Sequence, residues 1–181
     1  MQVVAELGYA AAGADAICAA AGVSKGLLWH YYDDLDALMT AAARRAFAEL
    51  IAAVAQAVEG TENVAQLLRT AIRRAAHLPE THAPLLQAIR QIVLNLQHAD
   101  GSLAMGEDEY GDLYAAQTEL LQRGQAEGSI RSDLDARLLA VTYQGTVDAM
   151  IDHLLRNPEI DPDAMAELTI RVLLDGMATR S

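Results

Sequence analysis

ADAICAAAGVSKGLLWHYY, the stretch from residue 14 to residue 32, carries the signals of two short helices joined by a tight turn. Gly22 follows the small residues of the first helix and can adopt a positive φ at little cost, as a turn between crossed helices requires. Ser24 is a favourable N-cap for the second helix, which begins at Lys25. Leu28 is expected to point into the core. The pattern therefore predicts a helix-turn-helix whose second helix has an exposed outer face.

Helical periodicity continues outward from this stretch, and strand signals are nearly absent. Three short helical segments come first, separated by Gly8, Gly13 and Gly22. Thr61 is the expected N-cap of a later helix, and residues 99–106 are the expected loop. The longer helices are expected over about 35–58, 61–77, 84–98, 107–127, 135–157 and 162–178, with Asp133 or Asp135 at the start of the fifth of these. The sequence therefore predicts an all-α fold of about nine helices.

The chain has 181 residues, which suits a small domain joined to a larger one. We expect a helix-turn-helix domain at residues 1–46 and a ligand-binding and dimerisation domain at residues 47–181. Cys18 is the single cysteine, so no intramolecular disulfide can form. Apolar stretches are interrupted by charges and no secretory signal opens the chain. A cytoplasmic protein without a membrane span is expected.

The formal net charge is −12, which argues against a surface coated for nucleic acid or anionic lipid. The charge is uneven, because residues 1–48 contain three basic and five acidic residues. Lys25, in the helix-turn-helix, is the only lysine of the chain. The first segment is therefore the less acidic part of the protein, although it is not basic.

Motifs for catalysis are missing from the sequence. None of the five histidines forms a pair with the i, i+4 spacing of a helical zinc site. The chain contains no glycine-rich phosphate loop and no nucleophile elbow. We therefore expect no catalytic residue, no metal site and no cofactor, and the protein is not expected to be an enzyme.

The order and spacing of several elements resemble the amino-terminal domain of the TetR family of transcriptional regulators. These elements are Gly8-Tyr9, Ile17, AGVSKG at 21–26, LLWHYY at 27–32 and Ala37-Leu38. A second stretch, QAEGSIRSDLDARLLA at 125–140, is similar to the turn before the penultimate helix in many members. The resemblance covers the first 40 residues in sequence and the remainder in architecture.

The resemblance implies a repressor that binds a double-stranded DNA operator as a homodimer, with two recognition helices in successive major grooves. It also implies a small-molecule inducer, expected to be lipophilic, that binds in the larger domain and releases the DNA. The residues that fall where family members touch DNA are Ser24, Lys25, Gly26, Leu27, Trp29, His30 and Tyr31.

Three departures from the family pattern, together with the acidic first segment, favour an alternative function. Threonine is usual at the position of Leu27, and lysine at the position of Leu35, at the start of the next helix. Residues 1–6 match only the end of the family's first helix. The alternative is a helical small-molecule-binding dimer with weak or lost DNA binding.

Polar side chains on the later helices are candidates for the ligand site, which needs an apolar cavity with a few placed polar groups. We expect this cavity between the helices at about 84–98, 107–127 and 135–156. Two other interpretations stay open, because the amides could be solvated and the tyrosines could be core residues. The candidates are Gln87, Gln91, Asn95, Tyr110, Tyr114, Gln117, Tyr143 and Thr146.

The two carboxyl-terminal helices, at about 135–156 and 163–178, carry apolar residues on more than one side. A helix that is apolar on two sides must be covered on both. Pairing these helices with their symmetry mates would form a four-helix bundle. We therefore expect the homodimer interface on this pair.

Overall fold

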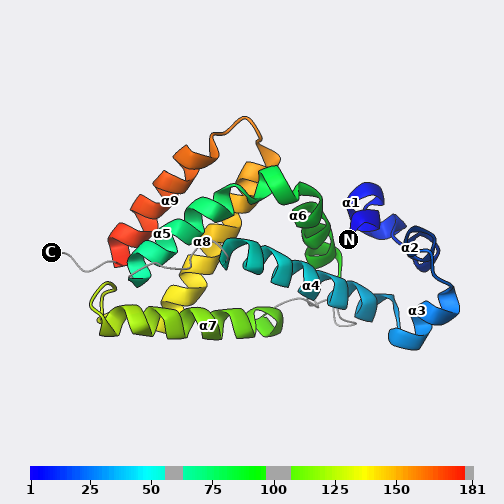
Figure 1. Ribbon diagram of the computed structural model, residues 1–181, viewed down its shortest axis with the longest axis horizontal. Coiled ribbons are helices and arrows are strands. Elements are labelled where there is room, and N and C mark those ends of the chain that lie inside the picture. The colour runs from blue at the N-terminus through cyan, green and yellow to red at the C-terminus, as the bar shows by residue number, and fades with distance from the viewer. Residues whose placement is uncertain (56–62, 97–106, 178–181) are drawn as a thin grey trace. The chain divides into compact units, whose positions relative to one another are not determined.

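The computed structural model describes residues 1–55, 63–96 and 107–177, which form nine α-helices, one short 3-10 helix and no strand (Figure 1). The predicted all-α fold with about nine helices is confirmed. The elements are α1 (Gln2–Leu7), η1 (Tyr9–Ala11), α2 (Ala14–Ala21), α3 (Lys25–Tyr31), α4 (Leu35–Ala55), α5 (Val64–Ala76), α6 (Leu78–Asn95), α7 (Glu107–Ala126), α8 (Ala136–Arg156) and α9 (Pro162–Met177).

Two compact units make up the chain. Unit 1 comprises residues 1–50 and 82–109, and unit 2 comprises residues 51–81 and 110–181. Helices α4 and α6 therefore each contribute to both units. The division within α6 falls at His82, whose φ of −128° and ψ of 23° interrupt the helix. The predicted domain boundary at residue 46 stays a prediction.

Unit 1 is held together by an apolar core that α1, α4 and α6 share. One side of α6 is buried in this core, with Ile92 and Leu96 almost inaccessible. Small residues allow the helices to approach closely, since alanine adds only one carbon beyond the backbone. The buried members of this core are Val4, Ala12, Met39, Ala43, Ala88, Ile92 and Leu96.

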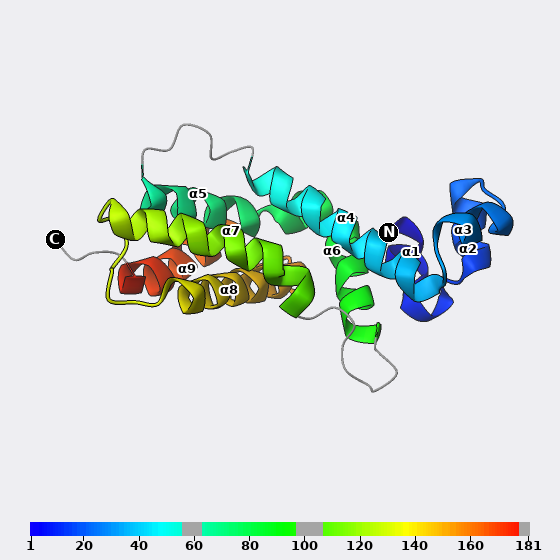
Figure 2. The same ribbon diagram turned by 90° about the horizontal axis from the view of Figure 1, so that it is seen from below.

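Unit 2 is a bundle in which α5, α8 and α9 pack against one another, and α7 lies alongside them in both views (Figures 1 and 2). The buried face of α8 includes Tyr143, Val147 and Met150, spaced three and four residues apart. That spacing brings side chains to one face of an α-helix. The largest fully buried side chains of the unit are Ile72, Leu121, Ile130, Met150, Ile170, Leu174, Met177 and Val64.

One amide side chain bonds to two carbonyl groups in the turn between α7 and α8. Gln125 Nε2 donates to the carbonyl oxygens of Arg131, at 2.9 Å, and Leu134, at 2.7 Å. Asp135 then caps α8, as expected for a helix starting at this position. Its carboxylate accepts the backbone N–H groups of Arg137 and Leu138, both at 2.9 Å.

The start of α5 differs from the sequence expectation. Asn63 is the N-cap, and its side-chain oxygen accepts the N–H of Gln66 at 2.9 Å. Thr61, the predicted cap, and the predicted loop at 99–106 lie outside the described residues. Asparagine and threonine both suit an N-cap, so the sequence alone did not distinguish the two positions.

Gly124 lies where α7 closely approaches neighbouring side chains. A Cβ built on Gly124 would lie 2.6 Å from Ile130 Cγ1 and 3.0 Å from Val64 Cβ. Nearby, Glu127 Oε1 accepts the Val64 N–H at 2.6 Å, which ties α5 to the end of α7. The absence of a side chain at residue 124 therefore permits this packing.

We expect Gly124→Ala to lower the free energy of unfolding by about 1–3 kcal/mol, because the added carbon overpacks a filled site. Gly111→Ala, on the same helix, meets nothing within 4 Å and is the matched control. It should be neutral or slightly stabilising, because alanine favours helix. Urea unfolding followed by circular dichroism measures both. Equal stability of the two variants would contradict the packing described for Gly124.

Candidate functional site

The turn between α2 and α3 has the predicted conformation. Gly22 adopts φ 66° and ψ 29°, a left-handed conformation that glycine accepts readily. The backbone N–H of Val23 bonds to the carbonyl oxygen of buried Cys18 at 3.1 Å. Ser24 Oγ accepts the N–H of Leu27 at 3.2 Å and so caps α3. These bonds set the direction in which α3 leaves α2.

Only one side chain of α3 is buried. Leu28 is 7% exposed and anchors the helix, whereas Trp29 is 41% exposed and Tyr31 is 72% exposed. Leu27 also lies on the surface, at 46%. Several large apolar side chains exposed together on a helix of seven residues mark a surface that contacts a partner.

The beginning of α3 is open to close approach. A Cβ built on Gly26 would meet only Ser24 Oγ, at 3.9 Å. At the other end, the rings of His30 and Tyr31 meet edge to face with centroids 5.2 Å apart. The structure thus brings the seven residues expected to touch DNA onto one capped helix, with backbone, hydroxyl, aromatic and imidazole groups available.

Lys25 is the single Lys or Arg in residues 1–43, and it is paired with an acid. Its Nζ lies 2.7 Å from Asp15 Oδ1, and both side chains are more than half exposed. The hydrogen bond to Asp15 raises the pKa of the Lys25 ammonium. Asp15 lies in the first turn of α2. The positive charge at the start of α3 is therefore accompanied by a negative charge from the preceding helix.

The start of α4 carries acidic and apolar residues instead of basic ones. Asp34 Oδ1 accepts the N–H of Ala37 at 2.7 Å, so Asp34 acts as a cap. Leu35 is half-buried and packs against the core of unit 1. A packing role thus accounts for an apolar residue at position 35.

The polar residues proposed for a ligand site fall in both units. Gln87, Gln91 and Asn95 belong to unit 1 and are exposed on α6, and Asn95 Nδ2 donates to the Gln91 carbonyl oxygen at 2.8 Å. Because the three amide side chains are exposed, the structure favours the interpretation that they are solvated rather than part of a ligand site. The side chain of Tyr110 lies outside the described residues.

The other candidates belong to unit 2, where one of them joins a polar cluster. Tyr143 is buried, and burial raises the pKa of its hydroxyl. Tyr114 is half-buried, and Thr146 Oγ1 donates to the Thr142 carbonyl oxygen at 2.8 Å. Gln117 Nε2 donates to Gln144 Oε1 at 2.6 Å, across the contact between α7 and α8.

Gln144 in turn donates from Nε2 to Asp148 Oδ1 at 2.7 Å. Burial raises the pKa of Asp148 to about 6, although the hydrogen bond from Gln144 opposes the shift. Neither Gln144 nor Asp148 was among the residues predicted from the sequence. Their i, i+4 spacing on a helix was the available signal, and it is a weak one because such pairs are common on solvated faces.

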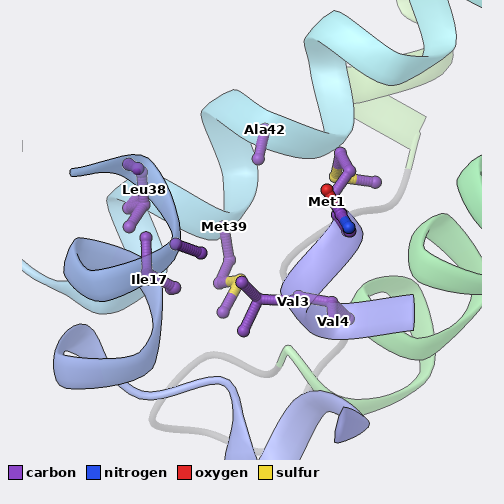
Figure 3. Close-up of a pocket in the computed structure, with 10 residues that line it drawn as sticks. Met1, Val3, Val4, Ile17, Leu38, Met39 and Ala42 are labelled. Carbon is purple, nitrogen blue, oxygen red and sulfur yellow. The ribbon is translucent and has the colours of Figure 1, made fainter. Parts of the chain in front are cut away.

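A pocket of about 240 Å³ in unit 1 lies between α1, α2 and the first half of α4 (Figure 3). Its wall is mostly apolar, and Met39 extends beside Val3 in the close-up. The side-chain amide of Gln2 at its edge already bonds to Glu6, at 2.8 Å. None of the residues predicted for the ligand site lines this pocket, and it offers few placed polar groups for recognition.

Within the described ranges, no group of three or more His, Cys, Asp or Glu side chains could hold a metal ion. His77 instead bonds to Glu80 Oε2 at 2.7 Å and to Asp163 Oδ1 at 3.2 Å. In the same residues, no helix has the length and apolar character that crossing a bilayer would need.

Comparisons with known proteins agree with this geometry. Residues 1–42 match the model of the bacterial regulatory proteins of the tetR family. A comparison with curated proteins finds no match.

Several solved structures share the fold over nearly the whole chain. The fatty acid degradation regulator FadR from Bacillus halodurans is 22% identical, with 97% of this chain and 94% of that chain covered and a TM-score of 0.78. FadR from Bacillus subtilis, solved in complex with stearoyl-CoA, is 19% identical over 97% and 94%, with a TM-score of 0.76. A putative transcriptional regulator from Pseudomonas aeruginosa PAO1 is 23% identical over 97% and 85%, with a TM-score of 0.78.

These identities are low, so the likeness to the solved structures establishes the fold, and the match over residues 1–42 establishes the kind of DNA-binding domain. The family consists of regulators rather than enzymes. Residues 1–42 therefore match the DNA-binding domain of the bacterial regulatory proteins of the tetR family, and the whole chain shares the fold of the solved regulators.

Proposed function

We propose that the protein is a cytoplasmic repressor that binds a double-stranded operator as a homodimer and leaves it when a lipophilic small molecule binds the helices after residue 46. The observation that carries this proposal is α3, a capped helix with one buried anchor and an exposed aromatic face. Such a helix fits the major groove by its amino-terminal end.

The DNA contacts divide by chemistry. Lys25 and the open backbone at Gly26 suit phosphates, while exposed Trp29 and Tyr31 suit the sugar-phosphate backbone. Leu27 offers an apolar contact, as to a thymine methyl group. The proposed DNA-binding residues are Ser24, Lys25, Gly26, Leu27, Trp29, His30 and Tyr31.

A lipophilic ligand is supported by a protein of the same fold, FadR from Bacillus subtilis, whose structure contains stearoyl-CoA. For this chain, we propose that the ligand contacts come from unit 2, where Tyr114, Gln117 and Tyr143 are wholly or partly buried. Gln87, Gln91 and Asn95, which the sequence also suggested, belong to unit 1, where they are exposed, and are not part of this proposed set. Tyr110 and Thr146 complete the proposed set.

A homodimer through α8 and α9 is supported by the apolar residues that these helices leave exposed. Leu138 and Val141 are exposed on α8, while Leu168 and Val172 are exposed on α9. Gly145 and Ala149 continue the exposed side of α8 and would allow close approach of a partner helix. The opposite sides of both helices are already buried in unit 2. An isologous four-helix bundle would cover the exposed sides in both protomers.

A second candidate function is favoured by a specific observation. Asp15 forms an ion pair with Lys25, the one Lys or Arg of α2 and α3. Half-buried Leu35 packs against the core of unit 1 at the position where the family resemblance implies a phosphate-binding lysine. Both reduce the electrostatic part of DNA affinity. The alternative is a ligand-binding dimer whose DNA binding is weak.

The replacement Tyr31→Ala tests the proposed interface. Because Tyr31 is 72% exposed, the variant should keep the melting temperature of the parent chain while its operator affinity falls about tenfold. The duplex is selected from a random library, and affinity is measured by fluorescence anisotropy. Leu94→Ala, at an exposed residue of α6, is the control and should bind like the parent. Unchanged binding by Tyr31→Ala would place the interface elsewhere.

The replacement Asp15→Asn should strengthen binding to the same duplex about threefold at low salt. A carboxylate about 6 Å from a phosphate costs roughly 0.7 kcal/mol in water, and Lys25 would also be released from its pair. The gain should shrink as salt screens the charges. Glu159→Gln removes the same charge from unit 2 and should leave the affinity unchanged. If both variants bind equally, Asp15 does not limit DNA affinity.

The pair Leu168→Glu and Val172→Glu tests the dimer. Both side chains are exposed in the single chain, at 58% and 72%, so the double variant should fold normally and sediment as a monomer. Four charges in the assembled interface would oppose association, which buries mostly apolar surface in obligate dimers. Leu94→Glu is the control and should keep the parent mass. A double variant that sediments as a dimer would exclude this pair of helices as the interface.

A further inference from the structure

Three polar side chains form a chain of hydrogen bonds between α7 and α8 in unit 2. Gln117 Nε2 donates to Gln144 Oε1 at 2.6 Å, and Gln144 Nε2 donates to Asp148 Oδ1 at 2.7 Å. At the free end of this chain, the Gln117 Oε1 atom is buried, and no described residue donates a hydrogen bond to it. It is therefore a buried acceptor at the end of an otherwise satisfied network.

The direction of the chain follows from the chemistry of its members. An ionised carboxylate only accepts hydrogen bonds, so Gln144 must present its NH₂ group to Asp148. The carbonyl oxygen of Gln144 then faces Gln117, which must present its own NH₂ group in return. Consequently, the side-chain atom of Gln117 that points away from Gln144 is the carbonyl oxygen. The ionised state of Asp148 thus determines, through Gln144, which end of the Gln117 amide is left without a partner.

A buried acceptor without a hydrogen-bond donor lowers the stability of the protein, so a ligand group that donates to it would be favoured. Leaving such a group without a donor costs about 1–3 kcal/mol. Among the described residues of unit 2, the buried side chains are apolar apart from Thr169, and they include Tyr143 and Val147, the neighbours of Gln144 and Asp148 in sequence. A group that completes the network must donate a hydrogen bond, and the rest of the molecule that carries it must tolerate apolar contacts.

We infer that Gln117 Oε1 is the polar anchor of the effector site and that the effector carries a hydrogen-bond donor, a hydroxyl or an amine N–H, at the end of an apolar body. This inference rests on the proposed function, because it assumes that a small molecule binds unit 2. The inference restricts the proposed effectors to molecules that carry a hydrogen-bond donor, and it excludes molecules whose only polar atoms are ether or ester oxygens. Gln144 and Asp148 act as positioning residues, since they orient Gln117 without touching the ligand.

Two isomers of the same formula, 1-nonanol and methyl octyl ether, test the inference on the full chain. They differ in that only the alcohol donates a hydrogen bond. Isothermal titration calorimetry should show that the parent protein binds 1-nonanol about three to ten times more tightly than the ether. In Gln117→Leu, this preference should disappear while the apolar part of the affinity remains. Gln122→Leu, at an exposed glutamine of the same helix, is the control and should keep the preference.

Asp148→Asn tests the orientation separately and keeps the inference testable if Gln117→Leu does not fold. Asparagine can donate to Gln144 Oε1 as well as accept from Gln144 Nε2, so the chain of amides can reverse. Gln117 would then present its NH₂ group, and the ether should bind at least as tightly as the alcohol. A positioning effect of this kind changes the ratio of two affinities, which a loss of stability alone would not do.

The outcomes separate the inference from the proposed function. Equal affinity of the parent protein for both isomers would overturn the inference and leave the proposed lipophilic ligand in place, with water as the partner of Gln117. A preference for the alcohol that survives in Gln117→Leu would also overturn it. Absence of binding by either isomer would contradict both the lipophilic ligand and the inference.

Discussion

The left-handed turn at Gly22 is the constraint on which the DNA-binding end depends. Helix α3 has seven residues, too few to be stable alone, because an isolated helix of that length has scarcely more than its nucleation turn. The turn, the Ser24 cap and the anchor Leu28 supply the missing stability. With one side chain committed to packing, the remaining positions of α3 are free to be chosen for contact with DNA.

Charge is the second constraint, because an acidic protein must still bind a polyanion. The family usually meets this need with several basic residues, whereas this chain has one lysine in residues 1–43 and pairs it with Asp15. Asp34 is used as a helix cap, which explains its presence but adds another negative charge nearby in sequence. In the proposed function, shape and aromatic contact at α3 contribute much of the affinity for DNA, and salt is expected to weaken binding less than in a basic protein.

The sequence was sufficient where the signals are local. Gly22 and Ser24 each act through backbone groups within three or four residues, so the turn and the cap of α3 could be predicted from residue type and spacing. For the start of α8 the sequence left Asp133 and Asp135 open, and Asp135 is the cap. Alternation of buried and exposed positions on α6 could be predicted in the same way. The cap of α5 could not be predicted, because two residues that suit an N-cap stand close together in the sequence, and Asn63 is the one that caps the helix.

Two contacts between different helices were not predicted from the sequence. Asp15 and Lys25 lie ten positions apart on different helices, and nothing in either helix indicates that they meet. Gln117 was predicted as a ligand residue, but its partner Gln144 lies 27 positions later on another helix. Contacts of this kind depend on how the helices cross, which composition and periodicity do not specify.

Helix α8 connects the two proposed activities of unit 2. At 3.6 residues per turn, Gln144 and Asp148 lie between the buried side, which carries Tyr143 and Val147, and the exposed apolar side, which carries Val141. The same helix thus contacts the core, the amide chain from α7 and the proposed dimer partner on three adjacent faces. A ligand that binds Gln117 would affect Gln144 through the hydrogen bond between the two amides. A closely packed helix such as α8 moves as a rigid body, because its interior contacts do not deform continuously. A shift of α8 would therefore change the proposed dimer interface directly. The energy for the shift would come from the effector, if it binds one position of α8 more tightly than the other.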